Sequence, residues 1–166
     1  MQNRVVVAYY SRSGHTRALG QEICRLLENG GLPVETVEIE PECELGTFKF
    51  GTRSLTGASE PVKECDMGLN EANLLLLGTS VWGGNPAPYL RGLMDQVRDL
   101  RGLPVVLFTT CAYGDSDAEQ DLREMVRTCG GRPMEYHVWR TRRDGNSGLS
   151  DVAEDVVASV QALLPH

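Results

Sequence analysis

The sequence has few cysteines and no grouping of them. The five cysteines lie far apart along the 166 residues, and none belongs to a Cys-x-x-Cys pair or to a Cys/His cluster. Zinc and iron–sulfur centres depend on such groupings, and small secreted scaffolds depend on disulfides, which need an even number of cysteines. This usage argues against a metal site and favours reduced thiols in a cytoplasmic protein.

Long apolar runs and an excess of positive charge are also missing. No stretch approaches the roughly 18 consecutive apolar residues that a membrane span needs. The opening Met-Gln-Asn-Arg leads directly into a valine-rich segment, without a signal-peptide pattern. Sixteen Lys and Arg against 23 Asp and Glu give a formal net charge of −7. We therefore expect neither nucleic acid nor an anionic membrane surface as a partner.

Strand and helix patterns alternate along the chain. The β-branched run at residues 5–9 does not alternate with polar residues, which is typical of a strand buried on both faces. Further strands are expected at 34–39, 74–79, 104–110 and 134–139, and helices are expected at 16–29, 86–100, 116–129 and from 150 onward. The alternation predicts an α/β fold, with a parallel sheet covered by helices on both faces. The length favours one domain over residues 1–166.

Two segments break this alternation. Residues 41–70 have scattered glycines and no sustained period, and they are too long for an ordinary connection between strands two and three. The segment is either a functional excursion or a surface insertion without a chemical role. The second segment, residues 140–148, is basic and contains glycine at the end of the fifth strand.

Ligands of open α/β sheets bind beyond the carboxyl ends of the strands, so the loops after strands one, three and four matter most. After strand one, hydroxyl side chains surround a glycine just before a helix. Backbone N–H groups, O–H groups and the helix dipole at such a place bind phosphate, although a simple helix cap is the alternative. This first loop comprises Ser11, Arg12, Ser13, Gly14, His15 and Thr16.

Several other phosphate-binding motifs are absent. There is no Gly-x4-Gly-Lys-Ser/Thr, no Gly-x-Gly-x-x-Gly after strand one, and no cysteine followed six positions later by arginine. These absences argue against P-loop, dinucleotide-fold and cysteine phosphatase sites. A phosphoacceptor domain would place acidic residues at the end of strand one, where Tyr9 and Tyr10 stand instead.

The loops after strands three and four each carry one aromatic residue beside glycine. The first comprises Thr79, Ser80, Val81, Trp82, Gly83, Gly84 and Asn85, and the second comprises Thr110, Cys111, Ala112, Tyr113, Gly114 and Asp115. Two aromatic side chains facing one crevice can sandwich a flat ring. The alternative for Trp82 is a place in the core under the following helix.

A phosphate loop combined with an aromatic slot describes a site for flavin mononucleotide (FMN). The chain resembles the flavodoxin family in these residues. Ser11-x-Ser13-Gly14-x-Thr16 matches its Ser/Thr-x-Ser/Thr-Gly-x-Thr phosphate signature, and the stretches 80–83 and 111–115 resemble its two ring-binding loops. The resemblance implies a five-stranded parallel sheet of order 2-1-3-4-5, bound FMN, and one-electron or hydride chemistry. Family phosphate loops usually lack cations, whereas this loop has Arg12, His15 and Arg17, which either neutralise the phosphate or point to solvent.

The first functional hypothesis is an FMN-binding electron carrier. Its redox partner protein would be steered by the acidic cluster of Glu35, Glu38, Glu40, Glu42 and Glu44, for which an ordinary solvated edge is an equally good interpretation. The alternative is an NAD(P)H-dependent FMN quinone or flavin reductase, in which Lys49, Arg53 and the run Arg140–Arg143 contact the dinucleotide or a substrate carboxylate. A third reading, a binding module that has lost its flavin, conflicts with the intact phosphate loop. Roles for Cys111 as a nucleophile or His15 as a proton donor have little support in the sequence.

Overall fold

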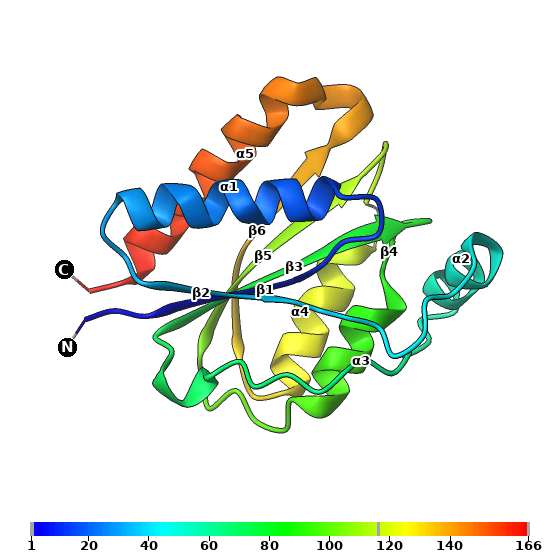
Figure 1. Ribbon diagram of the computed structural model, residues 1–166, viewed down its shortest axis with the longest axis horizontal. Helices are drawn as coiled ribbons and strands as arrows, with labels where there is room; N and C mark the ends of the chain where they lie inside the picture. Colours follow the sequence, from blue (N-terminus) through cyan, green and yellow to red (C-terminus); the bar gives the residue numbers. More distant parts are fainter. Residues whose placement is uncertain (1, 116, 166) are drawn as a thin grey trace.

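A parallel sheet forms the centre of the computed structural model, which describes residues 2–115 and 117–165 (Figure 1). Its strands pair in the order β2-β1-β3-β5-β6, and each neighbouring pair is parallel. The five strands are β1 (Val5–Tyr10), β2 (Val34–Glu38), β3 (Leu74–Trp82), β5 (Pro104–Cys111) and β6 (Arg132–Arg140). Counted along the chain, this is the predicted order 2-1-3-4-5. A short strand that the sequence did not indicate, β4 (Asn85–Pro86), pairs antiparallel with the end of β3.

Helices cover both faces of the sheet, as the alternation predicts. Helices α1 (His15–Asn29) and α5 (Thr141–Leu163) lie on one face, and α3 (Pro88–Gln96) and α4 (Ala118–Thr128) lie on the other (Figure 1). All six residues of β1 are buried because its alternating side chains enter the two cores, Val5 on one face and Val6 on the other. This explains why its sequence shows no polar alternation.

The strand register brings the predicted loops to one edge of the sheet. Tyr10 at the end of β1 pairs with Thr79 of β3, and Ser80 pairs with Thr110 of β5. The chain leaves β1 toward β2 on one side, whereas β3 and β5 lie on the other. The edge beyond β1 and β3 is therefore the point where the strand order reverses, which is where open α/β sheets bind ligands.

The segment 41–70 contains regular structure that its sequence did not indicate. Helix α2 (Thr47–Leu55) and a short 3-10 helix, η1 (Leu69–Glu71), interrupt it. Figure 1 shows α2 standing apart from the layers, at the end of the sheet where the strands finish. The segment is held by Phe50, which is fully buried against Tyr10 and Tyr89. The expectation of an irregular excursion is thus wrong for residues 47–55.

Two further boundaries differ from the sequence expectations. Helix α3 ends at Gln96, before the last apolar positions assigned to it, and α5 begins at Thr141, nine residues before the expected Ser150. The basic stretch is therefore mostly helical, with a break at Gly145 (φ 62°, ψ −162°). Ser116, the expected cap of α4, lies outside the described residues. None of the described helices is long and apolar enough to cross a membrane.

Candidate functional site

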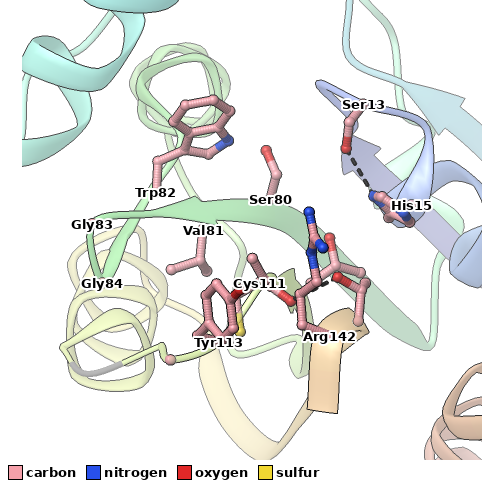
Figure 2. Close-up of a pocket in the computed structure, with 14 residues that line it drawn as sticks. Ser13, His15, Ser80, Val81, Trp82, Gly83, Gly84, Cys111, Tyr113 and Arg142 are labelled. Atoms are coloured by element: carbon pink, nitrogen blue, oxygen red, sulfur yellow. Dashed lines mark hydrogen bonds between the residues drawn. The ribbon is translucent and has the colours of Figure 1, made fainter. Parts of the chain in front are cut away.

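A cavity of about 400 Å³ lies at the carboxyl edge of the sheet (Figure 2). All three predicted loops reach it. From these loops its wall contains Ser13, His15, Ser80, Val81, Trp82, Gly83, Gly84, Thr110, Cys111, Ala112, Tyr113 and Gly114. The start of α5 adds Thr141 and Arg142, which the sequence did not assign to the flavin site. The other predicted site residues do not line the cavity: Ser11, Arg12, Gly14, Thr16, Thr79, Asn85 and Asp115.

Internal hydrogen bonds shape the β1–α1 loop. The Ser11 hydroxyl accepts from the N–H groups of Gly14 (3.2 Å) and Arg17 (3.1 Å). The buried Thr16 hydroxyl lies 2.7 Å from the hydroxyl of Thr110 on β5. Gly14, at the start of α1, has a φ of 95°, a left-handed conformation that favours glycine. The hydroxyls of Ser11 and Thr16 and the left-handed backbone of Gly14 therefore shape the loop.

The cavity side of this loop presents groups that suit an anion. Ser13 and His15 face the cavity, with the Ser13 Oγ 2.9 Å from the His15 Nδ1. Among the described residues, none accepts a hydrogen bond from the N–H of His15 or Thr16 in the first turn of α1. Free N–H groups and the positive end of a 15-residue helix together bind phosphate or carboxylate groups.

The two arginines of this loop are engaged elsewhere. Arg12 donates to the carbonyl oxygen of Leu45 (2.8 Å), pairs with Glu44 (3.2 Å), and stacks over the ring of Phe50 at 4.5 Å. Arg17 pairs with Glu38 on β2. Arg12 therefore joins the loop to the segment that carries α2, an arrangement different from both alternatives that the sequence suggested.

The loop after β3 is a tight turn. Gly83 and Gly84 both have positive φ (58° and 79°), as a two-residue hairpin loop requires, and the Asn85 side-chain amide donates to the Gly83 carbonyl. Thr79 is fully buried and donates to the Ser80 carbonyl. The Trp82 ring meets the Phe50 ring edge-on at 5.2 Å, so Trp82 both lines the cavity and packs against the core.

The loop after β5 is exposed in the middle and fixed at its end. Ala112, Tyr113 and Gly114 are exposed, and Tyr113 keeps 75% of its surface. The Asp115 carboxylate accepts from the Tyr136 hydroxyl and from the Arg140 guanidinium, at 2.8 and 2.9 Å. Asp115 therefore anchors the loop and does not enter the cavity.

The cysteine in this loop is a neutral thiol at physiological pH. Burial, with a smaller contribution from Asp115, raises the pKa of Cys111 to about 11. A thiol is a poor nucleophile when it is not ionised. The geometry therefore gives no support to a nucleophilic role for Cys111.

Among the described residues, one buried polar side-chain atom of the cavity wall has no hydrogen-bond partner. The Ser80 hydroxyl is buried, and no described residue hydrogen-bonds to it. In Figure 2 it lies between Trp82 and the Ser13–His15 pair. Buried hydroxyls are costly to leave unpaired, so this position suits a polar ligand group. The cavity thus fits an elongated molecule with an anionic group at one end and a flat ring at the other.

Comparison with known families decides the class. A family model described as NADPH-dependent FMN reductase matches residues 1–143. The chain belongs to the NADPH-dependent FMN reductase family. This membership confirms FMN as the cofactor expected from the sequence. No curated protein matches the chain.

Solved structures confirm the flavodoxin-like fold of this family member. A flavoprotein from Bacteroides eggerthii superimposes with a TM-score of 0.74 at 11% identity, covering 99% of this chain and 100% of that one. A flavoprotein from Lactobacillus acidophilus, solved in complex with FMN, gives 0.69 at 21% identity, covering 87% and 99%. A flavodoxin from Streptococcus pneumonia TIGR4 gives 0.67 at 14% identity, covering 97% and 99%.

Proposed function

We propose that the protein is an FMN-dependent oxidoreductase that takes electrons from NAD(P)H and passes them to a quinone or a flavin. The observation that carries this proposal is a cavity that joins an anion-binding loop to two aromatic side chains. The family match supports the same reaction class. Bound FMN would supply a ring that accepts two electrons and a proton from a reduced nicotinamide as hydride and returns the electrons to an acceptor.

Different residues of the cavity would bind the phosphate and the ring of FMN. Ser13 and the first N–H groups of α1 would hold the phosphate, and Trp82 and Tyr113 would flank the ring. The Ser80 hydroxyl would gain the hydrogen-bond partner that it lacks. Tyr113, as an exposed residue, leaves one side of the cavity open to a second flat ring such as a nicotinamide or a quinone.

The acidic cluster favours a reductase over a carrier. Four of its five glutamates form ion pairs: Glu35 with Arg4, Glu38 with Arg17, Glu40 with Lys63, and Glu44 with Arg12. Paired charges produce a weak field at a distance, and salt screens it further. The cluster therefore gives little steering to a basic partner protein, which is what an electron carrier would need.

Anaerobic mixing tests the proposal. The FMN-loaded protein is mixed with NADPH and with NADH, and the absorbance of the oxidised flavin is followed. Rapid bleaching by either nucleotide supports the reductase. A flavin that stays oxidised with both nucleotides, yet is reduced when a separate reductase is added, contradicts it.

The electron carrier is the second candidate. It is favoured by the formal net charge of −7, to which side chains across the whole surface contribute. A carrier of this kind would exchange electrons with a basic partner protein at rates that fall steeply with ionic strength. Rates that do not depend on salt would count against it.

A further inference from the structure

The start of α5 carries a cation into the cavity. The Arg142 backbone N–H donates to the Ala112 carbonyl (3.1 Å), and the Thr141 hydroxyl donates to the Cys111 carbonyl (3.3 Å). These bonds attach the β6–α5 junction to the loop after β5. Figure 2 shows the Arg142 guanidinium directed toward Ser80 and His15.

Arg142 differs from the other arginines around the cavity. Arg12, Arg17 and Arg140 each pair with a carboxylate. Within residues 2–115 and 117–165, no carboxylate forms an ion pair with Arg142. Arg142 and its neighbour Arg143 are both exposed, but Arg142 lines the cavity, whereas Arg143 does not line it and lies 3.9 Å from the Asp144 carboxylate with 74% of its side chain exposed. A positive charge that faces a cavity without a counter-charge suits an anionic ligand group.

The anion-binding loop itself supplies no free positive charge from its arginines. Its hydroxyl and N–H groups carry partial charges only, and Arg12 and Arg17 are neutralised by Glu44 and Glu38. A phosphomonoester carries close to two negative charges at neutral pH. Arg142 lines the same cavity as Ser13 and His15, so it is placed to supply the missing charge.

We propose that Arg142 binds the phosphate of the cofactor and makes the site selective for phosphorylated flavin over riboflavin. This role rests on the proposed binding of FMN in the cavity. Arg142 follows β6, an edge strand of the sheet, and lies outside the β1–α1 loop that carries the phosphate signature. Because the interaction joins the charge of the guanidinium to the charge of the phosphate, added salt should weaken it.

Titration of the apoprotein with FMN and with riboflavin tests the role of Arg142, with binding read from the flavin fluorescence. Arg142→Gln should weaken FMN about tenfold at low salt and leave riboflavin unchanged, because a hydrogen-bonded charge is lost only with the phosphorylated ligand. Arg142→Lys should restore part of the affinity. The difference between wild type and Arg142→Gln should shrink at high salt.

Arg143→Gln is the matched control, since it removes the same charge one residue away from a side chain that does not line the cavity. It should leave both affinities unchanged. An equal loss in the Arg143 variant, or an equal loss for both ligands in the Arg142 variant, would overturn the proposal. So would an unchanged FMN affinity with a raised KM for NADPH, which would assign Arg142 to the dinucleotide. A wild-type protein that does not bind FMN would instead refute the proposed function itself.

Discussion

The β1–α1 loop and the β5–α4 loop both line the cavity, but they are held in different ways. In the first, the Ser11 hydroxyl accepts two backbone N–H groups and the buried Thr16 hydroxyl bonds to Thr110. In the second, the residues from Ala112 to Gly114 are exposed, and hydrogen bonds hold the loop at its two ends, at the Ala112 carbonyl and at the Asp115 carboxylate. The β1–α1 loop is thus held by hydrogen bonds along its length, whereas the β5–α4 loop exposes its middle, at Tyr113 and Gly114, to solvent.

We therefore expect the β1–α1 loop to set the affinity for the phosphate and the β5–α4 loop to accept the flat rings. A preformed loop binds an anion without the entropy cost of ordering its own residues. An exposed loop accepts flat rings of different size and lets a second ring approach. Variants of the β1–α1 loop should therefore separate FMN from riboflavin, whereas variants of the β5–α4 loop should affect both ligands alike.

The largest difference between the two ligands should come from Ser13→Ala. A hydrogen bond to a charged group is worth about 1.5–3 kcal/mol, so FMN affinity should fall by ten- to a hundredfold. Riboflavin affinity should not change, because riboflavin has no phosphate. Titration of the apoprotein measures both values, and Ser13→Thr, which keeps the hydroxyl, serves as the control. A parallel loss of riboflavin affinity would remove Ser13 from the phosphate site.

A pair of glycine substitutions compares the two loops directly. Gly14→Ala forces a side chain into a φ of 95°, which costs about 1–2 kcal/mol, while its Cβ would have only the tip of Arg17 within 4 Å. Gly114→Ala adds a Cβ with nothing within 4 Å and no positive φ. We expect the first to lower thermal stability and FMN affinity and the second to change neither. Equal effects would show that the loops are equally constrained.

Removing the hydrogen bond from Tyr136 to Asp115, which anchors the β5–α4 loop, should have an intermediate effect on stability and flavin affinity. The Tyr136 hydroxyl donates to Asp115 and lies 2.8 Å from Thr109, which must then donate to Tyr136. Tyr136→Phe leaves both partners incomplete and should lower the free energy of unfolding in urea by about 1–2 kcal/mol. It should weaken FMN and riboflavin by the same factor. Tyr113→Phe, at an exposed side chain, is the control and should not alter stability. A loss confined to FMN would contradict the proposed division.

Tyr113→Ala should give the smallest change. Offset stacking contributes about 0.5–1.5 kcal/mol beyond area burial, so both ligands should bind a few-fold to tenfold more weakly. Because Tyr113 is largely exposed, the free energy of unfolding without ligand should stay the same. Affinities that do not change for either flavin would place the ring away from Tyr113.

The sequence predicts the strands and the loops of the site well, because their signals are local. The apolar run of β1 reflects burial on both faces, and Ser11 to Thr16 form a short contiguous motif. The strand order came from the resemblance to flavodoxins. The sequence does not indicate helix α2, because two of its apolar residues, Phe48 and Leu55, are exposed, at 88% and 63%. Its apolar positions therefore do not mark one buried face.

Interactions between distant residues could not be predicted in this way. Nothing near Arg12 in the sequence indicates that it bonds to Leu45, 33 positions later. The interactions of Asp115 are also between distant residues, because its partners Tyr136 and Arg140 lie on β6. Arg142 was recognised only as part of a basic run. Because Gly145 and Gly148 follow it, the sequence did not indicate the helical start of α5, which directs Arg142 into the cavity.

The most direct test of the account reads both ends of the cavity in one titration. The chain has two tryptophans, so Trp139→Phe leaves Trp82 as the only tryptophan emitter. FMN and riboflavin should each quench the Trp82 emission almost completely at saturation, because both place the same ring beside it. FMN should reach that end point at a concentration at least a hundredfold lower, since two or more hydrogen bonds to its phosphate are lost with riboflavin. Equal affinities for the two flavins, or a Trp82 emission that survives saturation, would contradict the account.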